Sequence, residues 1–278
     1  MTLLCSRKFR KHFYTVSKKI IIKTPEQIEG IKASSILAAK TLETVAPFVK
    51  TGVTTKYLND ICNQFMRDNK AIPATLGYRG YPAETCISVN DVICHGIPGP
   101  YVLRDGDILN IDVTTILNGY YGDTSKMYTV GLVSEYAQKL IDVTKESLAI
   151  GIGQCKAGNR IGFIGNAIDK YISAFGYSVV YEFCGHGVGI KFHEEPEVGH
   201  CRTEDLGPEM VPGMTFTIEP MINAGKARAK VDKKDKWTAR TIDGKLSAQF
   251  EHTICITTST PLVLTDINNE FPVPTSIF

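Results

Sequence analysis

The sequence lacks the features that mark membrane-spanning, secreted and zinc-finger proteins. No apolar run in its 278 residues approaches the roughly 20 residues that a membrane-spanning helix needs. The N-terminus shows no apolar stretch before a small-residue cleavage site, so we expect no secretory signal peptide. The eight cysteines have neither CxxC spacing nor a pairing pattern, which indicates reduced thiols in a reducing compartment.

Acidic residues are absent from residues 1–23, which carry seven of the 31 Lys and Arg residues. The other 24 basic residues stand against 29 acidic ones, so the rest of the chain is mildly acidic. A basic tail of this kind contacts RNA or a membrane surface, targets an organelle, or is simply solvated. We interpret residues 1–23 as a flexible extension and expect residues 24–278 to form a single domain.

Helix signals occur in two pairs, and strand signals follow each pair. Residues 24–27 form a capping box with proline at the first helical position, and Pro47 ends that helix. Apolar residues at helical spacing predict further helices around 58–66, 134–148 and 159–175. Strands are predicted at 86–90, 108–117, 120–130, 178–184, 214–220, 237–242 and 245–257. This order indicates an α+β fold with a duplicated unit and a central, mostly antiparallel sheet.

The dipeptide at 118–119, Asn-Gly, is the strongest hairpin signal in the chain and predicts a strand register. With these two residues as the loop, Thr114 lies opposite Asp123, and Asp112 points to the same face as Thr114. Asp112 and Asp123 are therefore diagonal neighbours on one face of an apolar strand pair. Two carboxylates so close repel unless a proton or a cation lies between them. The register favours a metal site over two surface acids.

Three more candidate ligands lie in the second half of the chain. Glu219 and Glu251 occur in alternating apolar segments, where an acid is costly unless it is paired or binds a metal. His186 lies in the glycine-rich segment 184–189. A lone histidine is more often a core residue than a ligand, but four candidate carboxylates accompany this one. One imidazole and four carboxylates suit Mn, Fe, Co or Zn in a bridged pair roughly 3.5 Å apart.

Six motifs then occur in a fixed order: CHGIP at 94–98, NIDVT at 110–114, GDTS at 122–125, GHGVG at 185–189, FTIEPM at 216–221 and SAQFEHT at 247–253. Together they resemble the type I methionine aminopeptidases over about residues 24–265. The resemblance implies the pseudo-twofold fold known as pita-bread, in a single catalytic domain. It also implies removal of the N-terminal methionine from nascent proteins and peptides, favoured when the second residue is small.

The resemblance implies a role for each metal ligand. Asp112 would hold one divalent ion bidentately, and Asp123 would bridge both ions. His186 and Glu219 would bind the other ion, with Glu251 as the second bridge. Hydroxide held by the two ions would attack the scissile carbonyl.

Other positions match substrate-contacting residues of that family. His95 and His193 would stabilise the tetrahedral intermediate, and Glu219 would shuttle a proton. The substrate set would comprise Tyr78, Tyr81, Cys86, His95, Thr114, Phe192, His193 and Trp237. An apolar slot that tolerates sulfur suits a thioether side chain, although each of these residues alone is typical of core packing. Asn90, Val92 and Ser247 match a monovalent-cation site.

The subclass is indicated by spacing. Glu219 and Glu251 are only 32 residues apart, too close for the long helical insertion of the type II enzymes. The zinc-finger extension of the eukaryotic cytosolic type I form is absent. The pattern therefore resembles the short bacterial or organellar form, and the segment 200–212 departs from the usual glycine-rich version.

Two other functions remain open from the sequence. An enzyme of the same fold that cleaves X-Pro peptides could use the same five ligands, and a non-catalytic relative could bind protein or RNA. The resemblance favours a monomer that acts in the cytoplasm on nascent chains without contacting a membrane. An organelle is the alternative location if residues 1–23 are a targeting peptide. Basic residues between 226 and 236 could contact ribosomal RNA, although a solvated face is the simpler interpretation.

Overall fold

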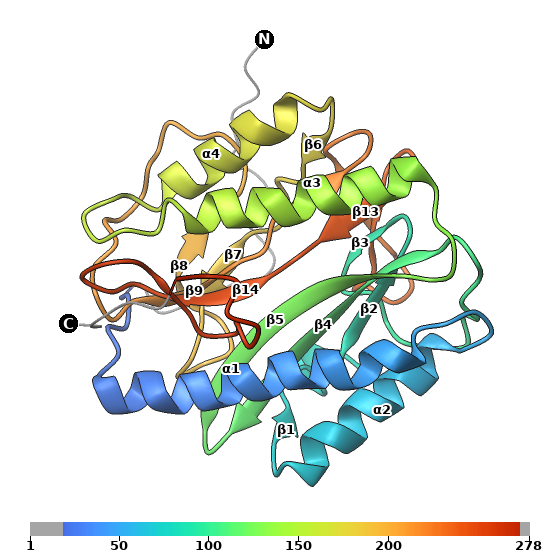
Figure 1. The fold of residues 1–278 in the computed structure, drawn as a ribbon, viewed down its shortest axis with the longest axis horizontal. Coiled ribbons are helices and arrows are strands. Elements are labelled where there is room, and N and C mark those ends of the chain that lie inside the picture. The colour runs from blue at the N-terminus through green and yellow to red at the C-terminus, as the bar shows by residue number, and fades with distance from the viewer. Residues whose placement is uncertain (1–18, 273–278) are drawn as a thin grey trace.

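In the computed structural model, which describes residues 19–272, the strands lie between two pairs of helices (Figure 1). The helices are α1 (Pro25–Val45), α2 (Thr55–Asp68), α3 (Glu135–Ile152) and α4 (Gly162–Ser173), with short 3-10 turns η2 (Ala46–Phe48) and η3 (Tyr78–Gly80). The helices α1 and α2 run along one side of the strands and α3 and α4 along the other, as the duplicated order predicts. The capping box of Thr24 and Gln27 begins α1, and Pro47 lies in the 3-10 turn that follows it.

The strands form four small sheets. One joins β1 (Ile72–Pro73), β2 (Cys86–Val89), β4 (Ile108–Leu117) and β5 (Tyr120–Thr129). A second joins β3 (Val92–Cys94), β11 (Ala229–Val231) and β12 (Ala239–Thr241), and a third joins β6 (Ser178–Val179), β10 (Met221–Asn223) and β13 (Ser247–Gln249). The fourth joins β7 (Gly185–Gly187), β8 (Glu194–Val198), β9 (Thr215–Ile218), β14 (His252–Cys255) and β15 (Leu262–Val263). Every strand pairing that these sheets contain is antiparallel, which confirms the predicted α+β class.

The hairpin of β4 and β5 has the predicted register. Leu117 pairs with Tyr120 across Asn118 and Gly119, and Thr114 pairs with Asp123. Both loop residues have positive φ, 52° and 85°, as a tight two-residue turn requires.

One predicted strand is broken in the middle, and another ends where it was predicted to end. The predicted strand 214–220 is β9, which stops before Glu219 and Pro220, and the unpredicted strand β10 follows directly; the predicted strand 245–257 becomes β13 and β14, which separate at Phe250 and Glu251. Proline has no N–H for the ladder, and the Glu251 N–H bonds to the Ser125 carbonyl of β5 at 3.1 Å instead. The breaks lie across from each other, because β9 pairs with β14 and β10 with β13.

The largest apolar core joins the two halves of the chain. Ile108 and Met127 of the first half pack among residues of α3, α4 and the later strands. A second core lies where α1 and α2 cover β4. Between β5 and α3 the chain passes over the surface, where Leu132 is 85% exposed.

The body of the protein begins before Thr24, where the sequence suggested its start. Ile20 packs against the largest core, and Lys23 is only 2% exposed. The rest of the predicted extension, residues 1–18, lies outside the described residues, as do residues 273–278. Within residues 19–272, no helix is long and apolar enough to cross a bilayer.

Candidate metal centre

The first two candidate ligands come from the β4–β5 hairpin. Asp112 of β4 and Asp123 of β5 lie two register positions apart, and Thr114 is opposite Asp123. The Thr114 hydroxyl donates a 2.7 Å hydrogen bond to Asp123 Oδ1. One oxygen of Asp123 is thereby fixed while the other stays directed toward the second half of the chain. The diagonal pair that the hairpin signal predicts is thus part of the folded protein.

His186 enters the same space from β7. Gly185 and Gly187 flank it, and a Cβ on either would lie within 2.4 Å of a backbone oxygen of the neighbouring strands. The two glycines are needed because β7 lies pressed between β8 and β9. His186 Nε2 lies 3.7 Å from Asp123 Oδ2 and 3.8 Å from Glu219 Oε1.

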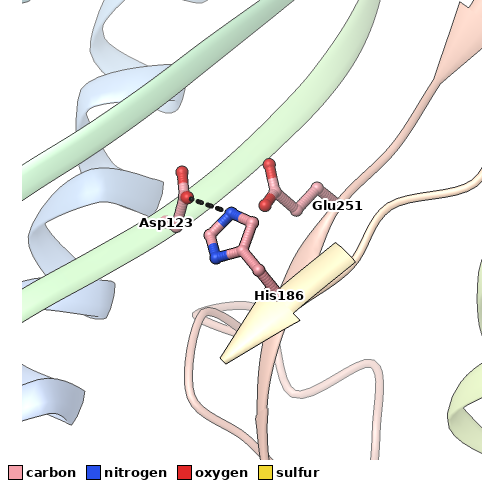
Figure 2. A group of neighbouring side chains, drawn as sticks. All are labelled: Asp123, His186 and Glu251. Carbon is pink, nitrogen blue, oxygen red and sulfur yellow. Dashed lines mark ion pairs between the residues drawn. The ribbon is translucent and has the colours of Figure 1, made fainter. Parts of the chain in front are cut away.

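Glu219 and Glu251 complete the cluster from the two strand breaks. Figure 2 shows Asp123, His186 and Glu251 converging, and one ligand atom from each of these three lies within 4.8 Å of the others. A bridge between Ser125 of β5 and Glu251 holds the glutamate backbone against the first half. An acid at a break in the ladder can turn inward because its strand no longer continues in one sheet.

The protonation of His186 indicates that a cation belongs in the cluster. Its Nδ1 lies 3.0 Å from the Gly187 carbonyl, which can only accept, so Nδ1 carries the proton. Burial lowers the pKa of His186 to about 4, so the ring is neutral near pH 7. The Nε2 lone pair therefore faces carboxylate oxygens, and acceptors directed at one another are unfavourable without a proton or a cation between them. A metal-ligating histidine commonly has this arrangement, in which the other ring N–H bonds to a carbonyl.

The carboxylates give the same indication. Burial, reinforced by the charge of Asp123, raises the pKa of Asp112, Glu219 and Glu251 well above the ordinary range. Burial raises the pKa of Asp123 to about 7. Asp112 Oδ1 is also buried without a hydrogen-bond partner. Four crowded carboxylates with an unpartnered oxygen and a neutral imidazole fit hard or borderline divalent cations.

Glu219 is held by three neighbours that the sequence did not single out. Thr217 Oγ1 donates to its Oε1 at 2.8 Å, and Gln249 Nε2 donates to its Oε2 at 3.2 Å. The backbone N–H of Glu219 donates to Nε2 of the buried His200 at 3.0 Å. Thr217 and Gln249 could have been found, because each is two residues from a ligand and so shares its face in a strand. His200 had no such signal, since it comes from a distant loop.

Part of the predicted substrate set forms an aromatic cluster beside His186. Tyr78 lies 4.6 Å from Phe192 between ring centroids and stacks on His193 at 5.1 Å. The rings of His193 and His186 are 4.0 Å apart. Tyr121, absent from the predicted set, stacks on Phe192 at 6.0 Å.

The remaining members of that set gather near Asp112. Cys86 pairs with Asp112 across β2 and β4 and belongs to one apolar cluster with Tyr81. Trp237 packs against that cluster, with its ring 5.2 Å from Tyr81 and 6.0 Å from His95. The predicted substrate residues therefore form two groups, one beside His186 and one beside Asp112.

His95 takes an unusual backbone conformation, with φ of 57°. Gly96 follows it, and a Cβ there would lie 2.2 Å from the Ile87 carbonyl oxygen, so this bend needs glycine. Burial lowers the pKa of His95 to about 4 and that of His193 well below its ordinary value. Near neutral pH both imidazoles are neutral, so each can donate one hydrogen bond without carrying a charge.

The predicted monovalent-cation residues lie together in part. The Ser247 N–H donates to the Asn90 carbonyl at 2.9 Å, and Val92 lies in the adjacent β3. The Asn90 side chain is already used, because its amide bonds to Asp107 and its oxygen accepts from the Ile108 N–H. Any cation at this place would depend on backbone carbonyls rather than on that side chain.

Comparison with known proteins gives consistent matches. Residues 29–258 match the model of metallopeptidase family M24. A methionine aminopeptidase from Salmonella typhimurium is 51% identical over 248 residues, covering 88% of this chain and 94% of the relative. The crystal structure of a methionine aminopeptidase from Rickettsia prowazekii superposes with a TM-score of 0.87 at 45% identity, covering 89% of this chain and all of the other. An Xaa-Pro dipeptidase from Bacillus anthracis, 22% identical, superposes with a TM-score of 0.72 over 90% of this chain and 63% of its own.

Proposed function

The chain belongs to metallopeptidase family M24 and, within it, to the methionine aminopeptidases, and from this premise we propose that it hydrolyses the first peptide bond of chains that begin with methionine. The supporting observation is the buried cluster of Asp123, His186 and Glu251, in which a neutral imidazole lone pair faces carboxylates. The protein has the pita-bread fold that the M24 peptidases share. No feature of a non-catalytic relative, such as a missing ligand, is found among these residues.

We propose that Asp112, Asp123, His186, Glu219 and Glu251 hold two divalent cations. Bound there, such ions would lower the pKa of water and polarise the scissile carbonyl. The identity of the ions, Co, Mn, Fe or Zn in our proposal, depends on the supply of metal as well as on this oxygen-rich donor set. Glu219 would take a proton at a carboxylate oxygen and return it to the leaving amine, in keeping with its position beside His186.

The two aromatic groups would orient the substrate. We propose that Tyr78, Phe192, Tyr81, Cys86 and Trp237 line the slot for the methionine side chain, because their rings and thiol offer polarisable, apolar surface. The neutral His95 and His193 would donate hydrogen bonds to the substrate carbonyl as negative charge develops on its oxygen. Thr114 would act through Asp123, whose oxygen its hydroxyl holds.

The protein has the proportions of the short, type I form. The 31 residues between Glu219 and Glu251 contain the short strands β10, β11, β12 and β13 and no helix. We propose the usual preference of that form for a small second residue. We also propose that residues 24–278 belong to one catalytic domain, because the largest core among the described residues draws on both halves.

Several contacts of the whole protein remain proposals. The buried thiols of residues such as Cys62, Cys94 and Cys155 fit a reducing compartment, and we propose that the protein acts in the cytoplasm as a monomer. An organelle is the alternative if residues 1–23 are a targeting peptide. The exposed basic residues between 226 and 236 would be the contact with ribosomal RNA, and the carbonyls around Asn90, Val92 and Ser247 would hold a monovalent cation.

A peptide assay tests the proposed function. Protein stripped of metal and then supplied with Mn or Co should release methionine from Met-Ala-Ser, more slowly from Met-Leu-Ser, and not at all without metal. An Ala-Pro dipeptide serves as the competing substrate for the X-Pro enzymes. Preferential cleavage of Ala-Pro would favour that rival, and binding of metal with no cleavage of any peptide would favour a non-catalytic role.

A further inference from the structure

Lys23 and Glu194 form a buried ion pair that the proposed reaction does not use. Lys23 Nζ lies 2.6 Å from Glu194 Oε2, and the two side chains are 0% and 1% exposed. The residues are 171 positions apart in the sequence. Removing two charges from water costs free energy, so we expect this fully buried pair to have a role beyond stabilising the fold.

Glu194 uses its other oxygen to hold a turn. Its Oε1 accepts hydrogen bonds from the backbone N–H groups of Ile190 and Lys191, both at 2.7 Å. Glu194 is the first residue of β8 and pairs with Gly187 of β7, so this turn closes the hairpin that carries His186. One carboxylate therefore fixes the path of residues 190–193.

That turn carries two residues of the proposed site. Phe192 and His193 follow the bonded N–H groups directly, and both rings contact Tyr78. His193 also lies 4.0 Å from the ring of His186. A small displacement of the turn would move both rings together relative to the metal ligands.

Lys23 is itself fixed by the segment that enters the body of the protein. Its N–H donates to the Gly213 carbonyl at 2.9 Å, and its Nζ also donates to the Ile21 carbonyl at 3.1 Å. Among residues 19–272, the Lys23 ammonium group is the cation that pairs with Glu194. Without it, a buried carboxylate would face two N–H dipoles alone and would draw in water or turn outward.

We propose that Lys23 is a positioning residue for the reaction, which through Glu194 holds Phe192 and His193 in the orientation that turnover requires. This inference rests on the proposed function. Lys23, in the segment just before the first helix, thus sets the geometry of the turn at residues 190–193, although the two are far apart in the sequence.

Substitution of Lys23 by an uncharged residue of similar length tests this role. In Lys23→Met we expect kcat on Met-Ala-Ser to fall about tenfold or more, with a smaller change in KM and unchanged metal content. In the double variant Lys23→Met/Glu194→Gln, no bare charge remains and the amide oxygen still accepts from the turn, so most of kcat should return. The matched control is Lys56→Met, which breaks an exposed pair with Asp60 of similar length and should leave kcat unchanged.

A spectroscopic readout separates positioning from mere stabilisation. Because the Tyr78 ring stacks on His193 with ring centroids 5.1 Å apart, its ring current should shift the imidazole proton resonances of His193 in the metal-free protein. These resonances should move in Lys23→Met and return in the double variant, at a temperature where both are fully folded. If Lys23→Met does not fold, Lys23→Arg, which keeps the charge but not the shape, should show an intermediate loss of kcat and an intermediate displacement.

Two results would overturn the inference. One is unchanged kcat and unchanged His193 resonances in Lys23→Met, or in Lys23→Arg where only that variant folds. The other is a loss of kcat that Glu194→Gln does not reverse. Failure of this inference is distinguishable from failure of the proposed function. Release of methionine by the unsubstituted enzyme tests the proposed function, whatever the Lys23 variants do.

Discussion

Asp112 and His95 lie close to the same centre, but we expect their substitution to affect turnover and metal content differently. Asp112 Oδ1 is buried without a partner, so Asp112→Asn removes a charge that only a cation would balance. We expect this variant to lose at least about a hundredfold in turnover and to retain less metal. His95→Ala should also reduce turnover, by about a hundredfold, with metal content unchanged, because its ring packs on Phe183 and Trp237.

Elemental analysis beside kinetics measures this difference. Full metal-dependent turnover in Asp112→Asn would remove Asp112 from the ligand set. Loss of metal in His95→Ala would make His95 a ligand rather than a substrate contact.

His200 gives a second prediction for a single residue. Its Nε2 accepts the backbone N–H of Glu219, next to Pro220, which has no N–H to anchor the chain. His200→Ala leaves that N–H without its acceptor, and we expect metal affinity to fall about 10- to 100-fold. Calorimetric titration of the metal-free protein checks this. Gly199→Ala is the matched control, since a Cβ there meets nothing within 4 Å, and an equal loss in both variants would contradict the role of the imidazole.

Asp123 should make the metal-free protein sensitive to pH. Burial raises its pKa from an ordinary value of about 4 to about 7. The folded state therefore binds more protons than the unfolded chain between these values. The resulting stability is fully present below about pH 4 and is lost as pH rises through about 7.

Denaturant unfolding in the presence of a chelator measures this effect. The free energy of unfolding of the unsubstituted protein, minus that of Asp123→Asn, should decline from pH 4.5 to pH 7.5. A difference that stays level or rises with pH would show that Asp123 is not held in a desolvated, protonated form.

At the scale of elements, the contact between α1 and β5 decides where Asp123 lies. A Cβ on Gly122 would lie 2.2 Å from the Ser35 backbone nitrogen of α1. Gly122→Ala should force the two elements apart, lower stability by about 1–3 kcal/mol and weaken metal binding at the adjacent Asp123. Gly119→Asn is the control, because that position has φ of 85° but open space, and asparagine tolerates the left-handed region.

Thermal unfolding and metal titration of both variants check this contact. We expect the control to lose less than about 1 kcal/mol and to keep its metal affinity. Comparable losses in the two variants would mean that backbone conformation, rather than the approach of α1, limits this hairpin.

The sequence predicts the elements well where the pattern is local. The capping box at Thr24 and the dipeptide at 118–119 set a helix start and a strand register from neighbouring residues alone. Both were correct because their causes, a cap bond and a turn with positive φ, lie within a few residues.

The sequence fails where a cause lies far away along the chain. The strand around Glu251 looks continuous because its alternation is continuous, yet the chain passes from one sheet to another at Phe250 and Glu251. The Ser125 carbonyl, 126 residues earlier in the chain, explains this break because it accepts the Glu251 N–H. The buried pair of Lys23 and Glu194 likewise has no local signature, so the start of the body at Thr24 was set too late.

For the whole molecule, bound metal should connect the two halves of the chain and stabilise the folded state. The hairpin of β4 and β5 supplies two of the proposed ligands, and the later strands supply three. Cations at a hundred times their dissociation constant should stabilise the folded state by about 2.7 kcal/mol, because only the folded chain assembles the site. Unfolding temperature measured against free metal checks this, and a chelator should reverse it. A midpoint that does not depend on metal would mean that the ligands do not form a binding site.

The exposed link at Leu132 separates the hairpin aspartates from the other three proposed ligands. A chain cut at such a surface link commonly tolerates the break. Neither fragment would contain all five proposed ligands, so binding of divalent cations would drive the two fragments to associate. Two separately produced fragments should therefore behave as a cation-gated split peptidase, inactive when mixed in chelator and active when metal is added.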